Sequence, residues 1–438
     1  MNQKQQLIDR LTSKQARIGV VGLGYVGLPF AVTFAKAGFH VTGIELDAAK
    51  AAKVNAGESY ILDVPTADVK ELAENGLLDA TTDYSVVKDL DAVAICVPTP
   101  LRETGDPDIS FIANATKWMQ SYFHPGLVIV LESSTYPGTT REVILPEITA
   151  TPGVTIGEDI FLGFSPERVD PGREDWMTKN TPKVLGGITP ACTEVATAWY
   201  SQAINTIVQV TSPEVAEMSK LLENTFRLVN TALVNELALI CNRIGIDVWE
   251  VVNAAATKPF GFMKFTPGPG VGGHCIPVDP IYLSWKMKSY NFNARFIELA
   301  TEINENMPRY VIQRVQDALN DDGKALRGSK ILVLGVAYKP NINDLRESPA
   351  LKIIPMLQAK GAKVQYNDPF VPKLVDKDID LVSVADLVSA VKDADCVVLL
   401  TGHKQYDYTM VQQNAKKILD TRNSFGDRGL VAQNIVRL

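Results

Sequence analysis

Residues 17–47, RIGVVGLGYVGLPFAVTFAKAGFHVTGIELD, contain the pattern that decides the fold of this chain. An apolar run at 17–22 ends in glycine, a helix-like stretch occupies 28–38, and a second β-branched run at 40–47 ends in acidic residues. Short continuous apolar runs are typical of buried parallel strands. Strands that alternate with helical stretches predict a doubly wound α/β sheet, of which this stretch is the first unit.

Three glycines between the first strand and the helix, Gly22, Gly24 and Gly27, form the pattern G-x-G-x-x-G. We expect Gly22 to make the tight turn, Gly24 to admit a pyrophosphate and Gly27 to let the helix pack on the strand. The helix N-terminus then faces the phosphates. Glu45, at the end of the second strand, would accept hydrogen bonds from the ribose and disfavour a 2′-phosphate, which predicts NAD rather than NADP. Lys50 could pair with the cofactor's phosphates. The competing interpretation is a glycine turn without a ligand.

Further strands are predicted at 91–98, 127–134, 159–167 and 205–211. The pattern then changes, because the stretch from Ser212 to about Gly245 contains a capping Ser, a Pro at the first helical position and no glycine until its end. This predicts a helix of roughly 50 Å at about 1.5 Å per residue. A helix of that length usually crosses between domains.

The C-terminal part repeats the plan of the first unit, with strands predicted at 330–338, 362–369 and 393–403 and a helix at 348–361. It carries GVAYKP where the first copy has GLGYVG, so it lacks the phosphate-binding glycines. The sequence therefore predicts an approximate internal duplication: two Rossmann-like doubly wound domains joined by a long central helix. The expected boundaries are 1–211, 212–310 and 311–438.

Composition excludes several classes of protein. The chain has 438 residues with 43 Lys+Arg and 50 Asp+Glu, so its formal net charge of 43 − 50 = −7 argues against a nucleic-acid partner. No apolar run approaches the length of a membrane-spanning helix. The five Cys have no paired spacing, which is typical of reduced thiols in the cytoplasm, and the four His have no ligand spacing that would indicate a metal.

One cysteine differs from the others. Cys275 lies in GPGVGGHCIPVDP, residues 268–280, and we expect it in a glycine-rich loop as a candidate nucleophile. The remaining cysteines, Cys96, Cys192, Cys241 and Cys396, are expected to be small buried hydrophobes. On the long helix, Lys220, Asn224 and Arg227 share one face, which is either a solvated polar stripe or the partner of the thiol.

Several motifs together resemble the UDP-sugar 6-dehydrogenases over nearly the whole chain: SPEVAEMSKLLENTF, GFSPERVDPG, ESSTYPGT, GPGVGGHCIPVDP and GVAYKPNINDLRESPA. The resemblance implies an NAD-binding N-terminal domain, a central dimerising helix and a C-terminal UDP-binding domain. It also implies a homodimer or higher oligomer, and a twofold oxidation of the sugar C6 alcohol to a carboxylate with two NAD, for surface polysaccharide synthesis.

Carried over position by position, the resemblance assigns Cys275 as nucleophile, Lys220 and Asn224 to the reacting oxygen, Thr135 and Glu167 to a water, and Asp279 to the carboxylate after the thiol. It implies cofactor contacts from Gly22, Gly24, Tyr25, Val26, Gly27, Glu45, Lys50, Thr99 and Thr135. Substrate contacts are implied for Arg168, Val169, Lys220, Asn224, Arg227, Lys258, Lys339 and Arg346. The role of Asp279, in orienting either Lys220 or the hydrolytic water, stays open.

The forms HCIPVDP and SPERVDPG, with Pro171 four residues after Glu167, are similar to the N-acetylhexosamine branch. This predicts UDP-N-acetylglucosamine as substrate, with UDP-N-acetylmannosamine or UDP-glucose as alternatives. A non-catalytic nucleotide sensor would not need Cys275, Lys220 and Asp279 together. A 3-hydroxyacid dehydrogenase would need neither a nucleophilic thiol nor a second nucleotide-binding domain.

Overall fold

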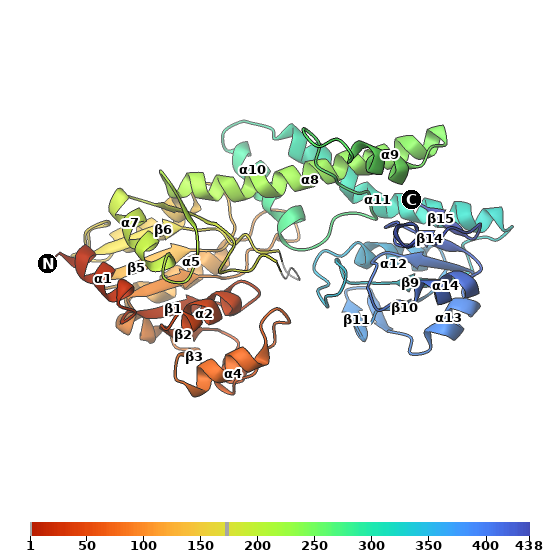
Figure 1. The fold of residues 1–438 in the computed structure, drawn as a ribbon. Coiled ribbons are helices and arrows are strands. Elements are labelled where there is room, and N and C mark those ends of the chain that lie inside the picture. The colour runs from red at the N-terminus through yellow and green to blue at the C-terminus, as the bar shows by residue number, and fades with distance from the viewer. Residues whose placement is uncertain (1, 171–174) are drawn as a thin grey trace. The chain divides into compact units, whose positions relative to one another are not determined.

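The computed structural model describes residues 2–170 and 175–438, so Pro171 lies outside the described residues. The chain divides into two compact units, each of which contains its own sheet (Figure 1). The first comprises Met1–Glu223 and Ile281–Phe292, and the second Asn224–Pro280 and Asn293–Leu438. Two helices, α8 (Pro213–Ile244) and α10 (Cys275–Lys288), contribute residues to both units.

The first unit is built on an eight-stranded sheet with the order β3-β2-β1-β4-β5-β6-β7-β8. Six of its strands confirm the predicted ones: β1 (Arg17–Val21), β2 (His40–Ile44), β4 (Ala92–Ile95), β5 (Leu127–Leu131), β6 (Ile160–Phe164) and β8 (Ile207–Val210). Sequence reasoning missed β3 (Leu78–Thr81) and β7 (Lys183–Gly187). Both lack a clear signal: the first is short and half polar, and the second ends in two glycines.

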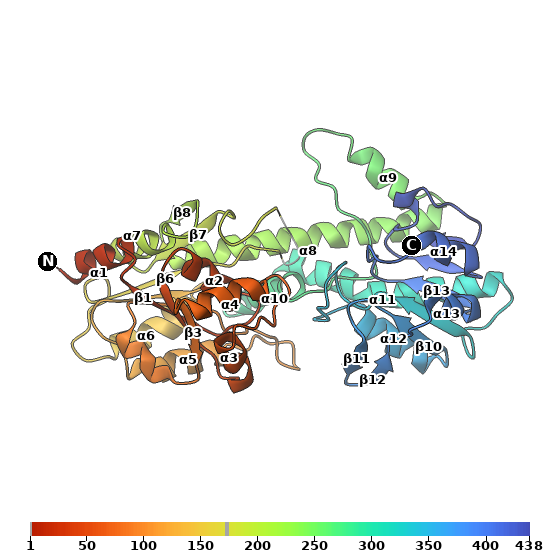
Figure 2. The same cartoon turned by 60° about the horizontal axis from the view of Figure 1, so that its bottom comes forward.

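Alternation along the strands sends side chains into two apolar layers of this unit. Ile18 and Val20 of β1 join one core cluster, whereas Val21 joins the other. The first layer packs under α1 (Gln3–Thr12), α2 (Gly27–Lys36), α3 (Ala48–Asn55), α4 (Thr66–Glu74) and α7 (Pro190–Tyr200). The second packs under α5 (Ser110–Gln120) and α6 (Leu145–Thr149) (Figure 2). Helices therefore cover both faces, as a doubly wound sheet requires.

The sheet departs from the predicted all-parallel arrangement at one place. Among the described strands, β6 and β7 form an antiparallel pair, whereas the neighbours on both sides are parallel. In the described parts of the connection between these strands, residues 165–170 and 175–182, there is no crossover helix. The carboxyl end of β6 therefore lies beside a strand that runs the other way.

The second unit has a five-stranded parallel sheet of order β10-β9-β13-β14-β15. This repeats the order β2-β1-β4-β5-β6 of the first unit and supports the predicted duplication. The strands are β9 (Lys330–Leu334), β10 (Lys363–Asn367), β13 (Cys396–Leu399), β14 (Ile418–Asp420) and β15 (Ile435–Arg437). One face packs on α11 (Arg295–Asp321) and α12 (Ala350–Ala359), the other on α13 (Leu387–Asp393) and α14 (Tyr408–Asn414). A hairpin of β11 (Lys373–Asp376) and β12 (Ile379–Val382) extends this unit.

The long helix α8 begins at Pro213 and ends at Ile244, as predicted. Gly245 stops it with a φ of +74°, the left-handed conformation that glycine adopts without steric cost. A short helix, α9 (Val248–Ala255), follows. In the part of the chain that the structure describes, no helix is long and apolar enough to cross a membrane.

Candidate active site

The glycine turn between β1 and α2 has the geometry that a dinucleotide needs. Gly22 has a φ of +86°, and a Cβ on Gly27 would lie 1.8 Å from the carbonyl oxygen of Gly22. By contrast, a Cβ on Gly24 would meet no heavy atom within 4 Å. The outer two glycines are therefore required by the protein's own backbone, while Gly24 leaves open space where a pyrophosphate can approach.

The acidic residue at the end of β2 is held beside this turn. Glu45 accepts hydrogen bonds from the Leu23 N–H at 2.9 Å and the Asp47 N–H at 3.1 Å. The remaining predicted contacts surround the same strand ends: Tyr25 is exposed, Val26 caps α2, Lys50 lies in the first turn of α3, and Thr99 is buried just after β4. The residues present thus fit NAD.

The second unit also has an acidic residue at the strand end that corresponds to Glu45, but its carboxylate is bonded to a buried histidine. Asp368, after β10, accepts from the backbone N–H groups of Val336 and Ala337 and from Nε2–H of His403 at 3.0 Å. Nδ1 of His403 accepts from the Asn341 N–H, which assigns the proton to Nε2. Both side chains are completely buried. The protein itself therefore occupies this second carboxylate, whereas a ribose contact is predicted for Glu45 of the first copy.

The thiol of Cys275 is exposed, whereas the other four cysteines are buried, as predicted. Its expected place inside the glycine-rich loop is wrong, since Cys275 is the first residue of α10. Asp279 lies one turn later on the same helix and is buried. Its Oδ2 accepts a hydrogen bond of 2.6 Å from Nδ2 of Asn224 on α8.

The glycines before the thiol are required by packing within the second unit. Gly270 and Gly273 have φ values of +132° and +86°. A Cβ on Gly272 would lie 2.7 Å from Cβ of Tyr338, and one on Gly268 would lie 2.4 Å from Nη1 of Arg422. Close approach to these side chains explains the glycines, so their contact with a sugar stays a prediction.

The three helical residues predicted to share a face differ in burial. Lys220 and Asn224 are buried, whereas Arg227 is exposed. The alternative of a solvated stripe therefore fails for the first two. Lys258, after α9, is exposed, and its ammonium lies 5.0 Å from the ring centre of Phe260.

Glu167, after β6, is held through both carboxylate oxygens. Oε1 accepts from the backbone N–H groups of Arg168 and Val169 at 2.6 and 2.7 Å, and Oε2 lies 3.3 Å from Nζ of Lys183. Burial opposes ionisation, but Lys183, the two N–H groups and Lys220 outweigh it, so the pKa of Glu167 lies below its usual value. The carboxylate is therefore ionised and available as a base.

Thr135 is buried, and its hydroxyl lies 2.7 Å from that of Thr139. The Thr139 hydroxyl already donates its single proton to the Tyr136 carbonyl, so Thr135 is the donor of the pair. Oγ1 of Thr135 therefore presents only lone pairs to other partners and can accept a hydrogen bond from a water or an amide. Arg168, by contrast, directs its guanidinium to the Glu223 carboxylate at 2.6 Å.

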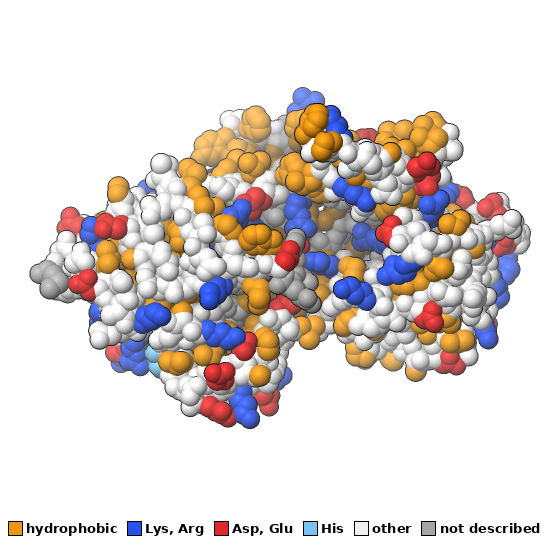
Figure 3. Space-filling view, in the orientation of Figure 1, with side chains coloured by type: hydrophobic (Ala, Val, Ile, Leu, Met, Phe, Trp, Pro, Cys, Tyr) orange, Lys and Arg blue, Asp and Glu red, His pale blue; other side chains and the backbone are white. Residues whose placement is uncertain are grey.

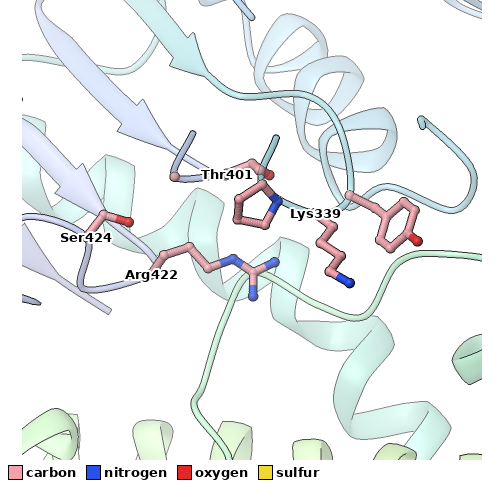
Figure 4. Close-up of a pocket in the computed structure, with 7 residues that line it drawn as sticks. Lys339, Thr401, Arg422 and Ser424 are labelled. Carbon is pink, nitrogen blue, oxygen red and sulfur yellow. The ribbon is translucent and has the colours of Figure 1, made fainter. Parts of the chain in front are cut away.

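A pocket of about 290 Å³ in the second unit brings two cations together. It is lined by Tyr338, Lys339, Pro340, Thr401, Gly402, Arg422 and Ser424. Figure 4 shows the ends of the Lys339 and Arg422 side chains facing the same open space. Burial lowers the pKa of Arg422 to about 10, against the effect of Asp420, so the guanidinium stays charged at neutral pH.

Of the predicted basic pair, Lys339 and Arg346, only Lys339 lines this pocket, and Arg422 is its second cation. Arg346 does not line it but forms a two-pronged ion pair with Asp344, while its carbonyl accepts from the Gly273 N–H. Arg422 was missed because it lies 83 residues from Lys339 in no recognisable motif. No strand was predicted where β14 precedes Arg422, so no signal marked this position.

Family models match three successive parts of the chain. They are the NAD binding domain at 16–204, the central domain at 214–306 and the UDP binding domain at 332–427 of the UDP-glucose/GDP-mannose dehydrogenase family. The chain belongs to this family. It is an NAD-dependent UDP-sugar dehydrogenase. The NAD turn lies in the first matched part, and the pocket of Lys339 and Arg422 lies in the third.

Individual relatives carry different sugar names. The UDP-N-acetyl-D-mannosamine dehydrogenase of Escherichia coli K12 is 36% identical, covering 89% of this chain and 94% of its own. The UDP-N-acetyl-D-glucosamine 6-dehydrogenase of Salmonella typhi is 34% identical, covering 90% and 91%. Among solved structures, the UDP-D-ManNAc dehydrogenase of Pyrococcus horikoshii superposes with a TM-score of 0.86 at 32% identity, covering 96% and 97%. These names do not select one epimer for this UDP-sugar dehydrogenase.

The different surroundings of two glycines predict two different defects. Gly24→Val should shift the thermal midpoint by no more than about 2 °C, because the new side chain meets only open space. It should raise the KM for NAD by about tenfold or more, since it fills the path of the pyrophosphate. Gly27→Val, the matched variant, should instead destabilise the fold. A Gly24→Val enzyme with unchanged KM for NAD would remove the turn from the cofactor site.

The cationic pocket predicts a defect confined to the nucleotide sugar. Arg422→Gln or Lys339→Met should raise the KM for the UDP-sugar by about 10- to 100-fold, the cost of one charge-assisted hydrogen bond. The KM for NAD should change less than about twofold. Arg309→Gln is the control, because Arg309 is exposed on α11, bonds Asn306 and does not line the pocket. Loss of NAD affinity alone would contradict this assignment.

Proposed function

We propose that this enzyme oxidises the C6 hydroxyl of a UDP-N-acetylhexosamine to a carboxylate, with Cys275 as the nucleophile. The observation that carries the proposal is the exposed thiol at the start of α10, one turn before a buried Asp279 that is bonded to Asn224. A dehydrogenase that removes a single hydride has no use for such a thiol. A four-electron oxidation needs one to retain the aldehyde between its two steps.

NAD, when bound, accepts the hydride that C6 releases in each oxidation. Between them, the Cys275 thiolate adds to the aldehyde carbon and forms a C–S bond, giving a thiohemiacetal whose oxygen takes up a proton. The second oxidation converts this adduct to a thioester. Water then attacks the thioester carbonyl, the C–S bond breaks, and the thiolate is regenerated with release of the carboxylate.

Charge that develops on the C6 oxygen needs fixed donors. Lys220, as an ammonium, and Asn224, one turn later on α8, are proposed to stabilise that oxygen at each stage. Because Nδ2 of Asn224 already donates to Asp279, that carboxylate fixes the orientation of the amide. We therefore propose that Asp279 positions Asn224, in addition to the two roles left open by the sequence.

Hydrolysis of the thioester needs a base. The ionised Glu167 is proposed to accept the proton of the attacking water, which Thr135 helps to hold through its acceptor lone pairs. Lys339 and Arg422 are proposed to bind the pyrophosphate of the substrate. Contacts from Arg168, Val169, Arg227, Lys258 and Arg346 to the UDP-sugar stay proposals taken from the resemblance.

The N-acetylhexosamine branch is supported by the HCIPVDP and SPERVDPG forms and by relatives named for both sugars. We retain UDP-N-acetylglucosamine as the predicted substrate. UDP-N-acetylmannosamine is the second candidate, favoured by the names of the E. coli relative and of the P. horikoshii structure. The product is proposed to enter surface polysaccharide synthesis in the cytoplasm.

A second copy of the chain is the proposed partner. Exposed apolar side chains recur along α8 at a spacing of three, four or seven residues: Val215, Met218, Leu222, Phe226, Leu233, Ile240 and Ile244. Figure 3 shows hydrophobic side chains gathered over the elements of this helical region. Such a stripe supports the predicted homodimer through the central helix.

The substrate assignment is tested with a panel of nucleotide sugars. Purified enzyme and NAD are incubated with UDP-N-acetylglucosamine, UDP-N-acetylmannosamine, UDP-N-acetylgalactosamine and UDP-glucose, and NADH is followed. We expect the highest kcat/KM with an N-acetylhexosamine, by about tenfold or more over UDP-glucose. A preference for UDP-glucose would overturn the branch assignment while leaving the family intact.

A further inference from the structure

A buried ammonium lies beside the proposed base but has no part in the mechanism above. Lys183, the first residue of β7, is 1% exposed. Its Nζ donates to the Glu132 carboxylate and to the Pro166 carbonyl at 3.2 Å, and it lies 3.3 Å from Oε2 of Glu167. Lysine is almost never buried to this extent without a specific partner.

The antiparallel strand brings Lys183 to this place. The register of β6 and β7 pairs Gly163 with Gly187 and Phe164 with Gly186, so its continuation sets Glu167 opposite Lys183. On the other side of β6, Leu131 of β5 pairs with Phe164, and Glu132 is the next residue. If β7 ran parallel to β6, its last residue instead of its first would lie beside Glu167. Lys183 would then be at the opposite end of the sheet.

Glu132 holds Lys183 in position. This carboxylate is buried, accepts from the Tyr200 hydroxyl through Oε1 and from Lys183 through Oε2. Burial raises the pKa of Glu132 to about 7 in spite of Lys183. Two carboxylates therefore share one buried ammonium. Removing these three charged groups from water costs free energy, and apolar side chains at the same positions would not incur that cost.

We propose that Lys183 is a positioning residue for Glu167: its ammonium fixes the orientation of that carboxylate, and Glu132 anchors the ammonium. This inference rests on the proposed role of Glu167 as the base of thioester hydrolysis. It differs from a purely structural role, in which Lys183 would serve only to neutralise Glu132.

The two roles predict different pH dependences. Titratable or charged groups face Glu167 from five elements or their ends: Cys96 after β4, Glu132 after β5, Lys183 on β7, Tyr200 on α7 and Lys220 on α8. Lys183 lowers the pKa of Glu167. Without it that pKa rises, so the base becomes protonated, and the rate is lost, at a higher pH than in the wild type.

The decisive variant removes the charges of both Lys183 and Glu132. Lys183→Met alone leaves two buried carboxylates facing each other and is expected to fold poorly. Lys183→Met with Glu132→Gln removes that repulsion and keeps a hydrogen-bonding partner for Tyr200. We therefore measure thermal unfolding, and kcat from pH 5 to 9 with NAD and each of UDP-N-acetylglucosamine and UDP-N-acetylmannosamine. Lys183→Arg, which keeps the cation, is the conservative control.

We expect the double variant to fold, to lose about tenfold or more in kcat at pH 8, and to move the acidic limb of the profile upward by about one pH unit. Lys183→Arg should keep the limb within about 0.3 unit of the wild type. A folded double variant with wild-type rate and limb would overturn the inference. Glu167→Gln distinguishes a failure of the inference about Lys183 from a failure of the proposed role of Glu167. Full activity in Glu167→Gln would overturn the role of Glu167 itself.

Discussion

The hydrogen bond between Asn224 and Asp279 is the contact on which the proposed catalytic geometry depends. Both side chains are buried, and the 2.6 Å bond joins α8 to the second turn of α10. A buried carboxylate without a partner is costly, so the pair fixes the rotation of both helices at this point. Cys275 lies one turn before Asp279, and Lys220 one turn before Asn224. This bond therefore holds the Asn224 amide against the helix that begins with the thiol.

The duplicated sheet shows how one architecture takes two ligands. In the first copy, Glu45 lies beside a glycine turn whose central glycine faces open space. In the second copy, Asp368 lies at the equivalent strand end, but it already accepts hydrogen bonds from His403 and from two backbone N–H groups. That copy instead gathers two cations, Lys339 and Arg422, in a pocket of about 290 Å³. The fold is retained while the polar groups at its strand ends change.

Sequence alone predicted what is local. The glycine turn, Glu45 and α8 depend on residues close together in the chain, and the structure confirms each element at nearly the predicted bounds. Long-range contacts escaped prediction. Lys183 opens a strand with weak β signal, and only its antiparallel register places it beside Glu167. Arg422 lies 83 residues from Lys339 in the chain, yet both line one pocket. Likewise, the close approach of Arg422 to Gly268 and of Tyr338 to Gly272 joins segments that are far apart in the sequence.

The central claim is that one thiol carries the substrate through both oxidations. It is tested most directly by the number of NADH formed per UDP-N-acetylhexosamine consumed, measured in wild type and in Cys275→Ala under limiting substrate. The account predicts two NADH and a uronic acid for the wild type. For Cys275→Ala it predicts a folded protein, since the side chain is exposed, that forms no uronic acid. Uronic acid at the full rate from Cys275→Ala, with two NADH per sugar, would contradict the account.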